Sequence, residues 1–482
     1  MGAEAFSHPV LEAKNAGHGR VLRPERAILE CAILQQDVDQ ARRDPAAARD
    51  ADSAGRTRVH PRSRRRARIY KPGLQGAEHH DHQRAPCALN QPFVTAVVGA
   101  LLLGIYVVME KIRELDGLRA IAALLVIAWH YIGAADGPNF WLWNVLYIGH
   151  FGVDLFFVLS GFLITTILLE NRDAPSFFSS FYGRRAFRIW PIYYLMVAIC
   201  FFGWLSGTNP VLFNGDVPGW TYLFGIQNFW MAKLQTTGVY WLGGTWSLAI
   251  EEQFYLVFPL VVRLVPPDIL PRVLIAVILV CPIGRLIDSF TPDTYGYYVL
   301  PQFRADVIAI GALIACYRLS RARSVAVTRQ VKRVLLGASC FVPVIMISGS
   351  ATFHAAAWQH TLAAIFFGAV VFMVLENQGA SYLAPLRSET GARFARWSYT
   401  SYMIHHWVAY LVFSQLGVTR TVTTLSGIAA TGLAFVTTFT LCAISYSFLE
   451  KPLNQYAHRK FTFGREQKFA VQPAREASTL NL

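Results

Sequence analysis

Charged residues are scarce in this chain of 482 residues. Asp, Glu, Lys and Arg make up 15% of the sequence and hydrophobic residues 54%, whereas an ordinary soluble domain is roughly 25% charged. With a mean hydropathy of +0.35, the polar residues are too few to cover the apolar surface, so lipid must solvate part of it. The composition excludes a purely water-soluble protein and predicts a polytopic membrane protein.

Cysteine is also sparse, and its spacing excludes two classes of site. No two cysteines are close in sequence, and several lie inside apolar runs, so neither a disulfide framework nor a zinc site is indicated and no metal site is predicted. The seven are Cys31, Cys87, Cys200, Cys281, Cys316, Cys340 and Cys442.

Positive charge is in excess, with a net charge of +14 and a pI of 9.6. These values would fit a nucleic-acid-binding protein. Beyond the N-terminal region, however, Lys and Arg collect in alternate short loops between apolar segments, which is the pattern that sets membrane orientation. We expect a lipid bilayer and not a nucleic acid as the partner.

Residues 1–91 form a basic N-terminal extension of a different composition. Aromatic residues are rare there, no apolar periodicity is visible, and both charge signs are mixed, so the region fits neither a secretory signal nor a transit peptide. We expect a disordered tail, with an over-extended start and Met109 as the working initiator as one option, and membrane-surface contact as another. In the apolar segment 92–110, the run 92–108 is at the lower length limit for a span. Whether it forms an additional membrane helix stays open.

Ten apolar stretches of about 17 to 25 residues follow, and each predicts a membrane helix because backbone polar groups must be satisfied internally in lipid. They cover approximately 115–133, 148–169, 188–207, 243–265, 270–287, 303–319, 332–350, 360–376, 397–415 and 424–449. The predicted fold is all-α, with a ten-helix membrane domain over 111–456 and a C-terminal tail over 457–482.

Basic residues follow the second, fourth, sixth and tenth spans and precede the first, which places those loops and the C-terminal tail in the cytoplasm. Ionisable residues inside the spans are costly and are therefore functional candidates. Arg119 and His130 are eleven residues apart, about 16 Å of helical rise and about 20° beyond three full turns. They are predicted to share one helix face, although a snorkelling Arg119 and an interfacial His130 would give the same pattern.

Further candidates lie in the next spans. Asp154 is at an outer depth close to that of His130. Arg184, Arg185 and Arg188 lie within a helical arc of about 100° and suit phosphate, which guanidinium groups grip bidentately, although an ordinary positive-inside flank is the alternative.

Two carboxylates, Glu251 and Glu252, lie in the outer half of the fourth span and point about 100° apart. One could orient a neighbouring imidazole while the other binds a polar ligand or is protonated. Arg304 and Asp306 are predicted to form a structural ion pair. For His405 and His406, a hydrogen-bonded core role and ligand contact both stay open.

Seven motifs together, in order over about 111–456, resemble the integral-membrane acyltransferase 3 family, bacterial O-acyltransferases that modify surface or secreted carbohydrates. They are LDGLRAIAALLVIAWH, FGVDLFFVLSGFLIT, FYGRRAFRIWPIYY, TWSLAIEEQFYLVFP, FRADVIAIGALIA, SYTSYMIH and FLEKPL. The resemblance implies a ten-helix unit in the bacterial inner membrane, cytoplasmic acyl-coenzyme A (acetyl-coenzyme A above all) as donor, no permanently bound cofactor, and an acceptor hydroxyl on a glycan or glycolipid.

The resemblance also implies roles for individual residues. His130 would be the general base, with Glu251 or Glu252 orienting it, and a transient acyl-histidine is the second option. The donor's phosphates would bind the cations Arg119, Arg185 and Arg188, and the substrate would contact Asp154 and His405. The chain departs from the family's usual pattern at His406 and in the N-terminal extension.

Two rival functions use the same residues. A secondary transporter also needs buried Asp, Glu, Arg and His, but no inverted repeat is evident in the sequence. An inactive scaffold in a glycan-assembly complex would tolerate replacement of His130. Some family members carry a C-terminal hydrolase-like domain, and with about thirty residues after the tenth span this chain is expected to act alone or with a separate partner.

Overall fold

The computed structural model describes residues 112–133, 146–207, 216–290, 295–320 and 355–464, together with residues 328, 329, 332, 333 and 337. All of them belong to the second of two compact units, Val98–Leu482. The expected extension 1–91, the segment 92–110 and nearly all of the seventh expected span, 332–350, lie outside the described residues.

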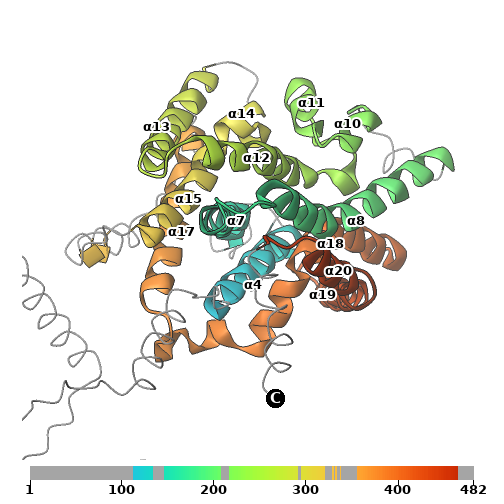
Figure 1. Cartoon of the computed structure of the whole chain (residues 1–482). Helices are drawn as coiled ribbons and strands as arrows, with labels where there is room; N and C mark the ends of the chain where they lie inside the picture. The colour runs from blue at the N-terminus through green and yellow to red at the C-terminus, as the bar shows by residue number, and fades with distance from the viewer. Residues whose placement is uncertain are drawn as a thin grey trace, which may run out of the picture. The chain divides into compact units, whose positions relative to one another are not determined.

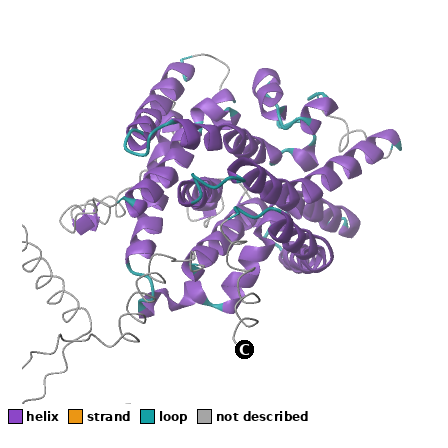
Figure 2. Ribbon diagram, viewed as in Figure 1, coloured by secondary structure: helices purple, strands orange, loops and turns teal. Residues whose placement is uncertain are grey.

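The described part of the chain is entirely helical and contains no strand, which confirms the all-α prediction (Figure 2). The longer helices are α4 (Arg113–Ala128), α7 (Gly152–Glu170), α8 (Phe177–Leu205), α12 (Thr245–Leu264), α13 (Leu270–Asp288), α15 (Ala305–Leu319), α17 (Ala355–Glu376), α18 (Glu389–Leu416), α19 (Leu425–Ser445) and α20 (Lys451–Lys460). Shorter elements are η1 (Trp129–Gly133), η2 (Ile148–Phe151), α10 (Gly219–Leu223), α11 (Gln227–Leu234), η3 (Tyr240–Leu242), α14 (Gly296–Val299), η4 (Pro301–Phe303), η6 (Ser381–Arg387) and η7 (Tyr446–Glu450).

Six of the described helices are long and apolar enough to cross a membrane, so the protein is a multi-pass membrane protein. They are Arg113–Ile132, Ile148–Glu170, Phe177–Leu205, Leu270–Asp288, Ala357–Glu376 and Leu425–Lys460. Three further helices, α12, α15 and α18, coincide with the fourth, sixth and ninth expected spans. They are shorter or more polar than the six: α15 has 15 residues, and α12 carries two glutamates and an arginine. The count of ten spans therefore stays a prediction.

The core of the bundle is built on two close helix pairs, α7 with α15 and α4 with α18 (Figure 1). In the first pair, Gly161 of α7 faces the backbone of Ile308, and Gly311 of α15 faces the backbone of Val158. A Cβ atom at either glycine would overlap the opposing main chain. Because lipid gives no hydrophobic drive for helices to associate, such close backbone packing holds membrane helices together.

The second pair brings together segments far apart in the sequence. Gly117 near the start of α4 packs against Leu386 of η6 and against Gly391 near the start of α18. His130 in η1, just after α4, contacts His405 in the middle of α18. The two helices therefore run parallel. Residues at equal distances from their starts lie at the same depth.

The end of α20 is fixed to the start of α8. Arg184 donates through Nε to the carbonyl of Phe461 at 2.6 Å, and Ser180 donates to the carbonyl of Thr462 at 2.6 Å. The arginine-rich start of α8 and the residues after α20 thus lie together, as expected if both face the cytoplasm.

Replacing Gly311 with Ala should destabilise the protein by about 1–3 kcal/mol, because the added methyl group forces α7 and α15 apart. The measurement is the thermal unfolding midpoint of the purified protein in detergent. Gly432→Ala on α19 is the matched control, since nothing lies within 4 Å of a Cβ atom there and Ala favours helix over Gly. Equal midpoints for the two variants would contradict the packing argument.

Candidate functional site

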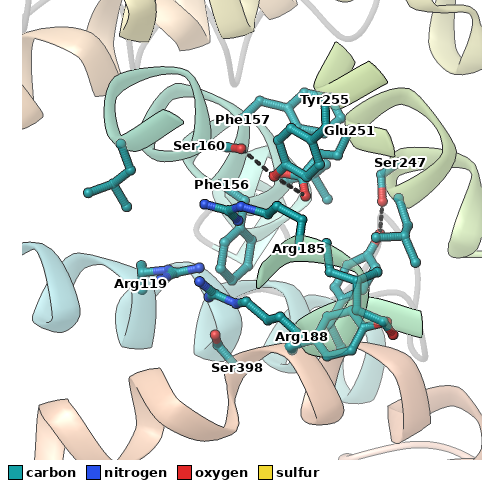
Figure 3. A pocket seen from close by; sticks show the side chains of 16 residues that line it. Arg119, Phe156, Phe157, Ser160, Arg185, Arg188, Ser247, Glu251, Tyr255 and Ser398 are labelled. Carbon is teal, nitrogen blue, oxygen red and sulfur yellow. Dashed lines mark hydrogen bonds between the residues drawn. The ribbon is translucent and has the colours of Figure 1, made fainter. Parts of the chain in front are cut away.

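A cavity lined with cations lies between α4, α7, α8, α12 and α18, with about 790 Å³ of empty space between its walls, part of it open. Figure 3 shows Arg119 projecting into it from α4, and Arg185 and Arg188 from α8. The structure thus brings together the three arginines that were predicted to bind the donor's phosphates, whereas Arg184, also predicted to suit phosphate, does not line the cavity. Residues three apart share a helix face, which explains how α8 presents both of its arginines to one hollow.

The charges of these guanidinium groups are not balanced within the protein. In the described part of the chain no ion pair or hydrogen bond engages Arg119, Arg185 or Arg188, and Arg119 and Arg188 repel each other. Arg185 lies over the ring of Tyr255, 5.1 Å from its centre. Cations that are partly shielded from water and have no ion-pair partner among the described residues make the cavity suited to an anion with several oxygens, such as a phosphate.

Glu251 lines the same cavity on α12. Its Oε2 accepts a hydrogen bond from the hydroxyl of Tyr255 at 3.1 Å, and that hydroxyl lies 2.6 Å from Ser160 Oγ (Figure 3). Glu252 faces another way, as its 100° offset requires, and accepts from the indole of Trp190 at 3.1 Å. Within the described residues neither glutamate contacts His130, so the structure does not bring the expected carboxylate and imidazole together.

His130 lies just beyond the end of α4, in the π-type turn η1. The α-helical phase ends at Ala128, so the predicted alignment with Arg119 holds only for the helix before this turn, and His130 does not line the cavity. Its Nδ1 is 2.9 Å from the carbonyl oxygen of Val126 and 3.3 Å from Nε2 of His405. His405 is the immediate neighbour of the predicted base, and its contact with substrate stays a prediction.

These contacts define the tautomers of both histidines. A carbonyl oxygen can only accept, so Nδ1 of His130 carries the proton toward Val126, and Nδ1 of His405 donates to the carbonyl of Tyr402 at 2.7 Å. In the neutral rings the lone pairs are then on Nε2. Nε2 of His405 faces His130, and Nε2 of His130 is left as a base.

Tyr402 connects the histidines to the cavity. It lines the cavity on α18, where its hydroxyl lies 2.6 Å from Ser247 Oγ and donates to the carbonyl of Gly244 at 3.0 Å. One helical turn further along α18 is His405. The parallel pair of α4 and α18 therefore presents the cavity arginine Arg119 near its start and, further along, Tyr402 one turn before the imidazoles.

Asp154 lies in a separate buried network. Its Oδ1 is 2.8 Å from Nη2 of Arg304, and its Oδ2 is 3.4 Å from Nδ1 of His360. All three side chains are at most 1% exposed. Both carboxylate oxygens are thus engaged within the protein, and the assignment of Asp154 to substrate binding stays a prediction.

The predicted ion pair between Arg304 and Asp306 is wrong. Asp306 pairs with Arg285 of α13, through distances of 3.0 and 2.8 Å, while Arg304 pairs with Asp154. Side chains two positions apart on a helix point about 200° away from each other. Arg304 and Asp306 therefore face different neighbours. An arginine deep inside the apolar run 270–287, far from Arg272 at its start, was the signal for Arg285, which sequence reasoning missed along with His360.

Comparisons with known proteins identify relatives of this chain. The acyltransferase 3 family model, described as an acyltransferase domain, matches residues 112–447, more than half of the chain. The peptidoglycan O-acetyltransferase OatA of Listeria monocytogenes is 27% identical over 382 residues, covering 74% of this chain and 58% of that protein. YrhL of Bacillus subtilis, provisionally named a peptidoglycan O-acetyltransferase, is 29% identical over 374 residues, covering 73% and 56%.

A shorter match is to the O-acetyltransferase OatA of Staphylococcus aureus strain NCTC 8325, 29% identical over 213 residues, covering 42% of this chain and 34% of that protein. The chain spans little more than half the length of the Listeria and Bacillus relatives. No solved structure matches it.

Replacing Asp154 with Asn should cost about 3–5 kcal/mol of stability, because it leaves the buried charge of Arg304 uncompensated. The measurement is the unfolding midpoint in detergent, together with the yield of folded protein. Glu389→Gln is the control, since it removes a carboxylate from an exposed pair with Arg396 and should leave the midpoint unchanged. Full stability of Asp154→Asn would instead favour the predicted contact with substrate.

Proposed function

This chain belongs to the acyltransferase 3 family, and we propose that it is a membrane O-acyltransferase that moves an acyl group from acyl-coenzyme A to a hydroxyl group of a cell-surface glycan. Acetyl is the proposed acyl group and peptidoglycan the proposed acceptor, since the Listeria relative is named for that reaction. A bacterial cytoplasmic membrane is the corresponding location.

The observation that carries the proposal is the cationic cavity. Coenzyme A has phosphate groups at one end and the reactive thioester at the other, so a site for it needs fixed cations at some distance from the reacting groups. Arg119, Arg185 and Arg188 line one hollow and are free of ion pairs in the described part of the chain. His130 is eleven residues from Arg119 toward the other end of the same helix pair, about 16 Å of rise.

The reaction at the histidines needs one proton acceptor. His130 Nε2 takes the proton of the acceptor hydroxyl as its oxygen attacks the thioester carbonyl. The new carbon–oxygen bond forms, the carbon–sulfur bond breaks, and the proton passes from the imidazolium to the leaving thiolate, giving the ester and free coenzyme A. Direct transfer needs no acyl-enzyme, although an acyl-histidine would use the same nitrogen.

His405 is the positioning residue in this scheme. Its Nε2 accepts from Nδ1–H of His130, which fixes the base in the tautomer with Nε2 unprotonated, and its own Nδ1–H is held by the carbonyl of Tyr402. We assign to Glu251 a role on the donor side, where it offsets part of the arginine charge. Asp154 supports the site indirectly by holding Arg304.

Replacing His130 with Ala should lower acyl transfer by about 10²–10⁴-fold, the usual contribution of a general base, with normal membrane insertion. The measurement is transfer of labelled acetyl from acetyl-coenzyme A to cell-wall glycan by membranes, with the ester identified by its release in mild base. Transfer by the variant at the wild-type rate would reject the assignment.

Arg188→Gln tests the cavity separately. It should raise the KM for acyl-coenzyme A by about ten- to a hundredfold, the worth of a hydrogen bond to a charged group, and change kcat less. Arg396→Gln, from the exposed pair with Glu389, is the matched control and should leave both constants unchanged. A transporter would instead move an intact solute and form no acylated glycan in any of these assays.

A further inference from the structure

Three imidazoles meet at the end of the α4 and α18 pair. Each of His130, His405 and His406 offers one ring nitrogen, and these nitrogens all lie within 4.8 Å of one another. The ring centres of His130 are 5.0 Å from His405 and 4.4 Å from His406, and the two neighbouring rings on α18 are 4.2 Å apart.

This spacing is close to that of a metal site. Imidazole nitrogens bind zinc at about 2.0–2.1 Å in tetrahedral geometry, which places ligand atoms about 3.4 Å from each other. His130 Nδ1 and His405 Nε2 are already 3.3 Å apart. Binding through Nδ1 of His130 requires its proton to move to Nε2, after which a modest rotation of the rings would bring three lone pairs onto one ion.

His405 has the support that metal ligands require. A ligating histidine donates its second ring nitrogen to a carbonyl or carboxylate, which fixes the lone pair toward the metal. Nδ1 of His405 donates to the carbonyl of Tyr402, its side chain is 1% exposed, and its Nε2 points at His130. The ligand nitrogen is therefore oriented before any ion arrives.

The surrounding charge allows an anionic fourth ligand. Arg420, which follows α18, interacts electrostatically with all three histidines. It lines a surface hollow together with Tyr240, whose ring centre is 5.8 Å from that of His406. Arg420 opposes a bare dication but stabilises a hydroxide or chloride bound to it, and three-histidine zinc sites keep such a fourth position open.

We propose that His130, His405 and His406 bind one divalent transition-metal ion, of which zinc is the representative, and that the bound ion blocks acyl transfer. The second part rests on the proposed function, because a neutral His130 ring bound to the ion through Nδ1 carries its proton on Nε2 and has no lone pair left to accept another. The first part concerns binding alone.

The binding experiment uses the full chain purified in detergent without a histidine tag. His79, His80 and His82, which lie close together in the sequence, are changed to Gln throughout so that they cannot contribute ligands. Zinc is measured by elemental analysis and by competition with a chromophoric chelator, and Co²⁺ absorption reports the geometry. We expect one ion per chain and an affinity at least about tenfold weaker in His406→Gln, as for loss of a supporting contact or ligand.

His458→Gln, on α20, is the matched control and should bind zinc like the parent protein. Zinc affinity that is the same in His406→Gln, His405→Gln and the parent would overturn the site, as would the absence of binding. In the transfer assay, zinc should inhibit the parent, a chelator should restore it, and His406→Gln should need at least about tenfold more zinc for the same inhibition.

Stimulation by zinc, or full activity with the site filled, would overturn the blocking role. The two proposals fail differently. A protein that binds zinc through the three histidines but forms no acylated glycan under any condition would refute the proposed function and leave the metal site standing.

Discussion

The parallel packing of α4 against α18 is the interaction on which the rest of the site depends. It is possible because Gly117 allows the chain at Leu386 and Gly391 to approach the backbone of α4. From that contact, the cavity arginine Arg119 follows on α4, and further along the pair the cavity residue Tyr402 lies one helical turn before His405. An enzyme that joins a charged donor to an acceptor on the other side of a bilayer needs such a division along one axis, since a single aqueous pocket would let the membrane leak.

Buried charge in this protein falls into two groups that have different physical consequences. Arg285, Arg304 and Arg387 each have a carboxylate within 3.0 Å, and their cost of burial is offset within the fold. The cavity arginines have no such partner among the described residues. A charge that is paired can be explained by stability alone, whereas a charge that has lost water without gaining a partner indicates a ligand that is yet to bind. Whether a charge has a partner, and not how many ionisable groups are present, therefore distinguishes the residues of the candidate site from those that stabilise the fold.

The sequence predicts much of this arrangement because the relevant signals are local. Apolar run length located nine of the described helices, although α8 begins 11 residues and α18 eight residues before the expected spans. The three-residue spacing of Arg185 and Arg188 predicted a shared face. The rest depends on tertiary contacts that spacing does not encode. The α-helical phase from Arg119 could not reveal the π-type turn that holds His130, and nearness in sequence suggested Asp306 for Arg304 although the fold supplies Asp154. The contact between His130 and His405 joins residues 275 positions apart, so no local pattern could have given it.

The arrangement of the histidines also affects how readily His130 would accept and release a proton. With both glutamates at the cavity, no carboxylate in the described region touches His130 to stabilise its cationic form, and the neighbouring groups are two more imidazoles and Arg420. A base among neutral and cationic neighbours returns its proton readily, which suits a step whose leaving group is a thiolate that must be protonated within the same turnover. The same region brings one ring nitrogen of each of the three histidines within 4.8 Å of the others. The features that would make His130 a readily reversible proton acceptor are thus the ones that would let the cluster capture a metal ion, and both proposals follow from one geometry.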